Sequence, residues 1–340
     1  MGRRLMGAAR PVASVSLDLD DLWTYLRTRG DPAWESRPSY LPTFLPRVLD
    51  LLQQHELRIT FFVVGYDATR ESNLPHLRAI AERGHEIGNH SFWHECWLQR
   101  YSPEQLDEEI GRAHEVLYKA TGQQPTGFRG PGFSWSPQLF ESLAKHGYTY
   151  DASTLPTFLG PLARLYFLAS AKLSPEQRTE RAALFGAARD GFRPNRPYEW
   201  SLRSGGRLLE VPVTTVPVLR TPFHLSYLLY LSRYSTALMR GYLRFALASC
   251  RAFGVEPSFL LHPLDLLGGD EVPQLAFFPG MDLTSARKAQ LFDEVLSVIA
   301  ERFDCVTVGE QARRILASPP GRAAVGTPGV SRVNTLHADG

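Results

Sequence analysis

Two histidines spaced four residues apart carry the strongest chemical signal in this sequence. The imidazole rings of His90 and His94 are of the side-chain type that most often binds metal ions. If the chain turns helical after residue 89, the rings project from one face, one turn apart, and can converge on one ion. A carboxylate cluster, Asp18, Asp20 and Asp21, follows an apolar segment upstream and can supply a third ligand and a base. On the histidine pair alone, chance spacing in a helix explains the pattern equally well.

The elements that must position these residues alternate between strand and helix. Residues 12–19 are apolar and β-branched, which predicts a buried strand. Further strands are predicted at 59–64, 85–88, 126–129, 148–151, 258–261 and 305–308, with helices at 42–57, 74–83, 102–120, 136–147 and 285–303 and a short last helix. This alternation indicates parallel βα units. Residues 20–43 are predicted to be a long loop whose four aromatic residues either serve function or pin the loop to the core.

Five polar patches stand at the ends of the predicted strands. They are residues 18–21, the pair His90 and His94, residues 129–132, Asp151, and His262. Active sites of parallel α/β folds lie at the carboxyl ends of the strands. A single buried Asp or His is usually a satisfied core group, but five such patches at equivalent positions predict one shared site.

Composition limits the kind of protein and its partners. The chain has 340 residues, 44% of them hydrophobic, and a formal net charge of +2, which does not indicate a nucleic-acid partner. Three unpatterned cysteines predict neither a disulfide framework nor a cysteine-based zinc site. No secretory signal or membrane span is recognisable, so a cytoplasmic location is expected. Residues 12–316 are predicted to form one domain with disordered tails at 1–11 and 317–340, and the oligomeric state is not indicated.

Residues 155–250 interrupt the alternation and are predicted to be an inserted cap. The segment holds a predicted helix at 162–172, a hairpin at 198–213 and a helical stretch at 219–250. In that stretch Arg233, Arg240 and Arg244 stand at helical spacing amid apolar residues. This pattern fits a peripheral contact with the cytoplasmic membrane face or a cap beside a lipid-linked substrate. A buried cap helix with solvated arginines explains it equally well.

With these motifs in this order, the chain resembles the polysaccharide deacetylase family, also known as NodB homology or carbohydrate esterase family 4. The resemblance covers residues 12–154 and 257–312 and implies a distorted (β/α) barrel with an inserted cap. The matching residues are Asp18 and Asp20, then His90, Ser91 and His94, then Arg129 to Gly132, then Asp151, and finally Leu261 and His262. Two departures stand out: one residue separates the first two carboxylates, and Gly132 stands where the family has an aromatic residue. Phe133 or Trp135 is expected to replace that aromatic wall.

The resemblance implies a role for each carboxylate and histidine. Asp20, His90 and His94 would hold a divalent ion, with zinc expected and cobalt, nickel or manganese as alternatives. Asp18 would be the general base. The alternative register makes Asp20 the base and Asp21 the ligand.

The remaining motif residues are expected to complete a hydrolytic site. Arg129 would orient Asp18, and a backbone N–H near Gly132 would stabilise an oxyanion. His262 would protonate the leaving amine, with Asp151 accepting a hydrogen bond from it. Leu261 would line a pocket for the acyl methyl group.

The function that follows is metal-dependent hydrolysis of a carbon–nitrogen amide bond. The preferred substrate is an N-acetylated amino sugar, either a small molecule or linked to a lipid or carrier. One alternative is a deformylase or other C–N hydrolase acting on a formamido-sugar lipid or a small amide. A silent carbohydrate-binding member is less favoured, because the motifs are intact.

Overall fold

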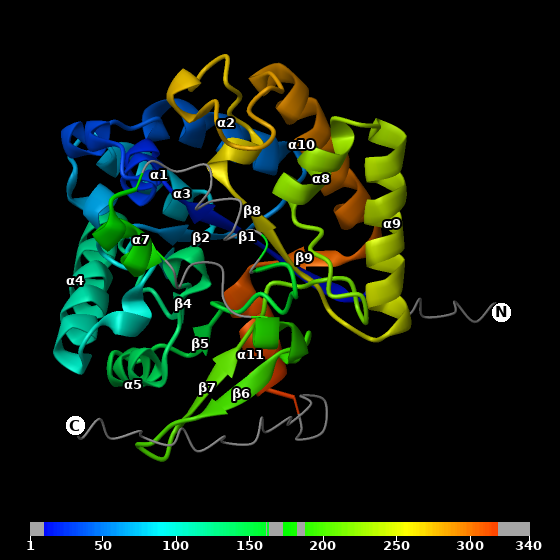
Figure 1. Ribbon diagram of the computed structural model, residues 1–340. Helices are drawn as coiled ribbons and strands as arrows, with labels where there is room; N and C mark the ends of the chain where they lie inside the picture. Colours follow the sequence, from blue (N-terminus) through cyan, green and yellow to red (C-terminus); the bar gives the residue numbers. More distant parts are fainter. Residues whose placement is uncertain (1–9, 161, 163–172, 182–187, 319–340) are drawn as a thin grey trace.

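The computed structural model describes residues 10–160, 162, 173–181 and 188–318 and shows one curled sheet surrounded by helices (Figure 1). Its strands are β1 Val12–Leu19, β2 Thr60–Val63, β3 Glu86–Asn89, β4 Gly127–Phe128, β5 Tyr150–Asp151, β6 Tyr198–Ser201, β7 Arg207–Glu210, β8 Ser258–Leu261 and β9 Asp304–Val306. The order is β6-β7-β5-β4-β3-β2-β1-β8, and β9 pairs with the start of β1. Every pair is parallel except β6 with β7.

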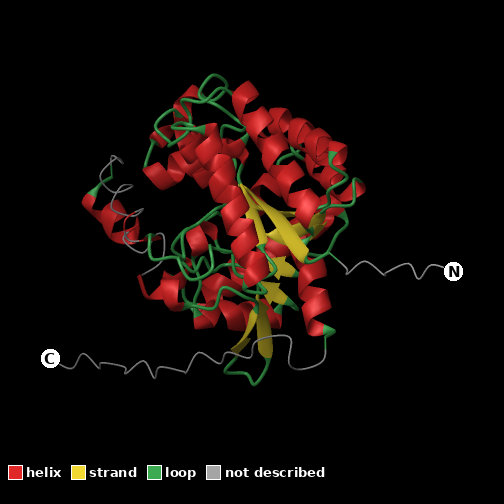
Figure 2. Cartoon of the chain, turned by 90° about the vertical axis from the view of Figure 1, so that its right-hand side faces the viewer, coloured by secondary structure: helices red, strands yellow, loops and turns green. Residues whose placement is uncertain are grey.

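Helices pack around the sheet (Figure 2). They are α1 Leu22–Arg29, α2 Leu41–Gln54, α3 Leu74–Glu82, α4 Pro103–Thr121, α5 Pro137–Lys145, α7 Pro175–Arg181, α8 Leu225–Ser232, α9 Thr236–Ala252, α10 Ser285–Arg302 and α11 Val308–Leu316. Local sequence explains where α4 begins and ends. Ser102 and Gln105 form a reciprocal capping box at its start, and Gly122 adopts the left-handed conformation after its last turn.

An irregular segment, residues 211–215, closes the sheet into a distorted barrel. It continues from β7, and the Val211 and Val213 amides donate to the carbonyls of Asp151 and Thr154. On its far side, the Thr214 amide donates to the Ser258 carbonyl at 3.0 Å, and the Ser258 amide donates to the Thr214 hydroxyl at 2.8 Å. The fold class predicted from the sequence is confirmed. The predicted hairpin at 198–213 exists, but it belongs to the barrel wall and not to a separate cap.

Strand alternation separates a polar barrel interior from an apolar exterior. In β1 the side chains of Ala13, Val15, Leu17 and Leu19 join the main hydrophobic core with the surrounding helices. The alternate residues Ser14, Ser16 and Asp18 are buried on the opposite, interior side. Phe62 and Tyr150 belong to a separate buried cluster with Val308 and Ala312 of α11. Polar chemistry is therefore concentrated inside the barrel.

Two predictions about the helical segments were wrong. Residues 20–43 are not a long loop, because α1 and a 3-10 turn, Pro32–Ser36, occupy most of them. The stretch at 219–250 is two helices, with Arg233 at the break between α8 and α9, so the three arginines do not share one helical face. Residues 163–172 of the predicted helix, and nearly all of both tails, lie outside the described residues. No helix in the described parts of the chain is long and apolar enough to span a membrane.

Candidate active site

Arg129 and Asp18 form a buried ion pair inside the barrel. The Arg129 side chain is fully buried, and its Nη1 donates to Asp18 Oδ1 at 2.7 Å and to the Ser16 hydroxyl at 2.8 Å. Its Nε donates to the Ala152 carbonyl, and the guanidinium lies 4.4 Å from the centre of the Phe62 ring. A fixed cation of this kind orients the carboxylate.

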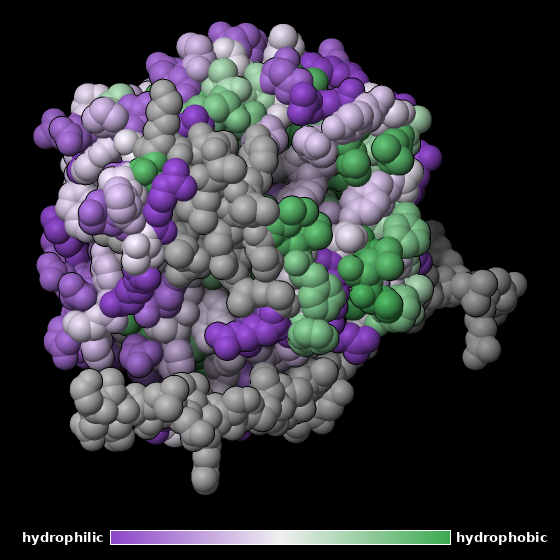
Figure 3. All heavy atoms as spheres, in the orientation of Figure 1, coloured by the Kyte–Doolittle hydropathy of each residue, from purple (hydrophilic) through white to green (hydrophobic). Residues whose placement is uncertain are grey.

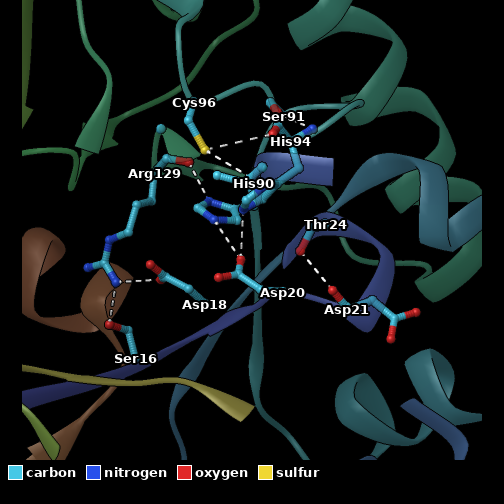
Figure 4. Close-up of polar contacts among 12 residues, drawn as sticks. Ser16, Asp18, Asp20, Asp21, Thr24, His90, Ser91, His94, Cys96 and Arg129 are labelled. Carbon is cyan, nitrogen blue, oxygen red and sulfur yellow. Dashed lines mark hydrogen bonds and ion pairs between the residues drawn. The ribbon is translucent and has the colours of Figure 1, made fainter. Parts of the chain in front are cut away.

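A second cluster, beside this ion pair, joins Asp20 to both histidines (Figure 4). Asp20 Oδ1 lies 3.2 Å from His90 Nε2 and 2.9 Å from His94 Nε2, and all three residues are buried. Their ligand atoms lie within 4.8 Å of one another, and no other such group occurs in the described part of the chain. Burial opposes charge on Asp20, but His94 and His90 hold the pKa of its carboxyl well below the usual range. Burial also opposes charge on His94, yet Asp20 raises the pKa of that ring well above its ordinary value.

The donor atoms of this cluster fit a divalent cation. His90 Nδ1 lies 2.7 Å from the Arg129 carbonyl, so Nδ1 carries the hydrogen and the Nε2 lone pair faces Asp20. This second contact is the usual way in which a protein fixes a metal-binding histidine. Asp20 Oδ1 is buried and satisfied by no ordinary hydrogen bond. The lone pairs of His90 Nε2 and Asp20 Oδ1 are directed at the same small space and need a cation between them. A zinc ion with one carboxylate and two imidazole ligands would be such a cation.

The histidine pair does not lie on a helix, so the two rings converge without the helical turn that was considered for them. Ser91 and His94 both have left-handed backbones, with φ of 64° and 56°. The loop is held instead by side chains. Asn89 Oδ1 accepts from the Ser91 amide, and the Ser91 hydroxyl accepts from the His94 amide. Such local side-chain bonds compete with helix formation and bring both rings to the same carboxylate.

Asp21 lies outside the cluster, and its position distinguishes between the two registers considered for the first motif. Its Oδ1 accepts from the Leu22 amide at 2.8 Å and the Tyr40 amide at 3.0 Å, so it caps α1. Burial raises the pKa of Asp21 to about 6. Asp18 and Asp20, two residues apart, point to the same side, whereas Asp21 points away (Figure 4). The structure therefore brings Asp18 and Asp20, and not Asp21, to the histidines and Arg129.

His262 follows β8 directly beside the carboxylates. Leu17 of β1 pairs with Leu261 of β8, so Asp18 and His262 come next on neighbouring strands. His262 Nδ1 lies 3.4 Å from the Ser226 hydroxyl, which donates to Asp265 Oδ1 at 2.7 Å. Asp265 Oδ2 also accepts from the His262 amide. This series of hydrogen bonds, from His262 Nδ1–H through Ser226 to Asp265, fixes the ring and leaves Nε2 for proton transfer.

The predicted contact between Asp151 and His262 is not found among the described residues. Asp151 accepts from the Ser153 hydroxyl at 2.6 Å and from its amide, and it lies against buried Glu210. The reason is strand alternation: Tyr150 faces the interior cluster, so Asp151 points to the other side of the sheet. Burial raises the pKa of both Asp151 and Glu210, which favours a shared proton between them.

Leu261 is also on the wrong side for its expected role. It belongs to the main core cluster, in register with outward-facing Leu17. Leu260, fully buried and in register with Ser16, faces the barrel interior instead. Leu261 therefore does not face the barrel interior, where the acyl pocket was expected.

The turn after β4 places the remaining predicted residues. Gly132 and Phe133 both adopt positive φ, and both lie half-buried in the turn that follows Arg129. A side chain at Gly130 would meet the Ser134 carbonyl at 1.9 Å, so this approach requires glycine. Trp135 is stacked against Phe140, with ring centroids 5.8 Å apart, and packs in a core cluster with it. Phe133 therefore remains the candidate for the wall of the site.

Three contributions to the site were missed by sequence reasoning. Ser226 and Asp265 reach His262 from α8 and from the turn after β8. Tyr25 comes from the segment expected to be a loop, and burial together with nearby Asp20 raises the pKa of its hydroxyl well above 10. Glu109 of α4 accepts from the Phe92 and Trp93 amides and so braces the histidine loop. No local motif marks these residues, because they approach the site through tertiary packing.

Comparison with known proteins agrees with this arrangement. Residues 10–150 match the family model for polysaccharide deacetylase. This part of the chain is therefore similar to the polysaccharide deacetylase family. A peptidoglycan-N-acetylglucosamine deacetylase from Bacillus cereus is 34% identical over 107 residues, which are 32% of this chain and 48% of that protein. The peptidoglycan-N-acetylmuramic acid deacetylase PdaA of Bacillus subtilis is 33% identical over 106 residues, 31% of this chain and 39% of that protein. The match thus spans less than half of the length of each relative.

A solved structure extends the likeness of fold to nearly the whole chain. A Mycobacterium smegmatis protein assigned to the polysaccharide deacetylases aligns with a TM-score of 0.59 and 21% sequence identity. The alignment covers 91% of this chain and 94% of that one. At this level of identity the comparison supports the fold alone.

Proposed function

We propose that this protein is a metal-dependent hydrolase that removes the acetyl group from an N-acetylated amino sugar. One observation carries the proposal: Asp20, His90 and His94 converge beside a separate carboxylate, Asp18, that is paired with Arg129. The match of residues 10–150 to the polysaccharide deacetylase family model supports the same chemistry. A divalent cation held by Asp20, His90 and His94 would supply Lewis acidity for water and for the amide carbonyl.

The side chains around this cation site divide the proton transfers between them. Asp18 is the general base that accepts a proton from the attacking water, and Arg129 orients it. His262 is the general acid that protonates the leaving nitrogen from Nε2, while Nδ1–H is directed to Ser226. Asp265 stabilises the charged ring through Ser226. A base and an acid on neighbouring strand ends suit amide hydrolysis, in which both steps are needed.

The proposal is tested with the purified chain and a panel of N-acetyl and N-formyl amino sugars, free and lipid-linked. Acetate release should be abolished by chelation and restored by zinc, cobalt, nickel or manganese. His90→Ala should lose bound metal, measured by elemental analysis, together with activity. The proposal fails if chelated protein retains full turnover or if His90→Ala keeps stoichiometric metal. Formate release without acetate release would replace deacetylation by deformylation, and the cytoplasmic location stays a separate prediction for cell fractionation.

A further inference from the structure

Large apolar side chains are exposed together over α8, α9 and the loop that precedes them (Figure 3). The residues that define this surface, called the apolar face below, are Val218, Leu219, Leu238 and Phe245, exposed by 71%, 55%, 52% and 50%. Tyr230, Tyr234 and Phe253 are exposed nearby in the sequence. Single exposed apolar residues are ordinary on protein surfaces, but a grouped set indicates an interaction surface.

The loop and α9 form one structural unit. The Tyr242 hydroxyl donates to the Pro222 carbonyl at 2.8 Å and lies 2.9 Å from the Thr221 hydroxyl. Tyr242 therefore ties the loop to the helix. Leu238 and Phe245 stand four and three residues from Tyr242, so all three share one side of α9. Val218 and Leu219 are thereby held beside that side of the helix.

The loop presents its apolar tip at a conformational cost. Val218 and Arg220 have φ of 69° and 56°. A positive φ is a true outlier for a β-branched residue. The loop is closed by the Val216 amide on the Thr221 carbonyl and by the Arg220 amide on the Val216 carbonyl. Backbone strain that keeps Val218 in solvent gives the fold no packing in return, which points to a function for the exposed tip.

The charge of this region is one-sided. Residues 211–255 contain no Asp or Glu, although the whole chain has 35 acidic residues in 340. The same 45 positions carry five arginines, at 220, 233, 240, 244 and 251. Arg233 and Arg240 are neutralised by Asp282 and Glu294, whereas Arg244 and Arg251 form no ion pair within the described residues. The surface is thus apolar with a residual positive charge.

We propose that the apolar face docks the protein on an anionic lipid surface. Exposed aliphatic and aromatic side chains enter the boundary between headgroups and acyl chains, and unpaired arginines contact the anionic headgroups. The absence of any carboxylate from these 45 residues removes the repulsion that such a surface would otherwise impose. A protein partner of mixed charge would place no such restriction on the sequence.

The docking surface is connected directly to the site. Ser226 at the start of α8 contacts His262, and Tyr227 packs against His224, whose ring lies 5.9 Å from that of His262. The apolar face therefore lies on α9 and the loop, and α9 packs against α8, the helix whose Ser226 contacts the general acid. It follows that the substrate amide is reached at a lipid surface. This consequence rests on the proposed function, whereas docking itself does not.

The test is flotation of the full chain with vesicles of phosphatidylcholine, with and without phosphatidylglycerol, at low and high salt. Wild type should float with anionic vesicles, and less so at high salt. The combined variant Val218→Ser, Leu219→Ser, Leu238→Ser and Phe245→Ser should bind at least about tenfold more weakly. Arg244→Gln should weaken binding about fivefold.

The matched control is Tyr118→Ser with Leu316→Ser, which removes side chains of similar exposure, 54% and 50%, from α4 and α11. This control should bind like wild type. The proposal is overturned if wild type does not float, or if the four-residue variant binds as well as the control. It is also overturned if ultracentrifugation shows a dimer that only the four-residue variant dissociates, because a second copy then covers the face. Acetate release from a soluble amino sugar, measured in parallel, should be unchanged in all these variants, so failure of docking and failure of the proposed function are separable.

Discussion

Two carboxylates with different neighbours define the site at the scale of single side chains. Asp20 faces two imidazoles, whereas Asp18 faces a buried guanidinium and a serine hydroxyl. Two acidic side chains of the same type can thus take different roles, a ligand and a base, because their surroundings differ. The first prediction separates these roles.

Asp18→Asn should leave the metal bound and reduce turnover by about 10²–10⁴-fold, because removal of a general base costs this much. Metal content is measured by elemental analysis and turnover by acetate release. Asp21→Asn is the matched control in the same motif and should keep both metal and most activity, with a loss of stability from the weakened α1 cap. Loss of metal from Asp18→Asn would show that the roles of the two carboxylates are wrongly assigned.

Ser226 offers a test of how His262 is held. Ser226→Ala removes the acceptor for Nδ1–H, which should lower turnover about tenfold, the order expected for one hydrogen bond to a charged group. Ser226→Thr keeps the hydroxyl and should restore turnover, which is measured by acetate release. An equal loss of turnover in Ser226→Ala and Ser226→Thr would show that the hydroxyl does not hold the ring.

Sequence reasoning found most site residues because they follow strands, and it erred where side-chain direction mattered. Asp18, Asp20, His90 and Arg129 were identified by position and resemblance. Asp151 and Leu261 were placed on the wrong side. A strand of two residues such as β5 has too few positions for its alternation to be read, so the inward direction of Tyr150 emerges only from the assembled barrel.

At the scale of elements, the loop between β3 and α4 is held both by α4 and by local side chains. Glu109 accepts two amides of this loop, and Asn89 and Ser91 accept two more. The i, i+4 spacing of the histidines indicated a helix, but these side chains stabilise a non-helical path. Similarly, α1 was missed because its apolar pattern is weak and its cap, Asp21, was read as a site residue.

His85, at the turn between α3 and β3, gives the fold a measurable pH dependence. Its buried Nδ1 accepts from the Ile59 amide at 3.2 Å, and burial lowers the pKa of the ring to about 4, from 6.5. Between these values the unfolded chain binds more protons than the folded chain, so stability falls as the pH drops from 6.5 towards 4. The loss should reach roughly 3 kcal/mol at pH 4.

His85→Asn keeps an acceptor near Nδ1 but does not titrate in this range, so it serves as the reference. Chemical denaturation of both proteins between pH 7 and 4 should show a steeper loss of the free energy of unfolding in wild type, by roughly the amount above. Parallel curves for the two proteins would show that His85 is not the titrating group.

At the scale of the whole molecule, two short hydrogen bonds between Thr214 and Ser258 complete the ring of strands. Thr214→Val has nearly the same shape but leaves the buried Ser258 amide without its acceptor, which should cost about 1–2 kcal/mol. Thermal and denaturant unfolding measure the loss. Thr149→Val removes an exposed hydroxyl and should change stability by less than about 0.5 kcal/mol. Equal stability of both variants would mean that the closure contributes little.

The segment that closes the barrel runs from Val211 through Thr215 into the loop at 216–222 and then into α8. This segment is held at Thr214 by the contact with Ser258 and at Ser226 by the contact with His262, so two separate requirements fix the number of residues between these points. The hairpin turn at 203–206 is less restricted, since a side chain added at Gly205 would meet no atom within 4 Å, and the Arg203 amide, which donates to Glu141, lies at its first residue. Over evolution, or in engineering, chain length should therefore vary freely at that turn, while insertions and deletions between 214 and 226 should be rejected even where single substitutions are tolerated.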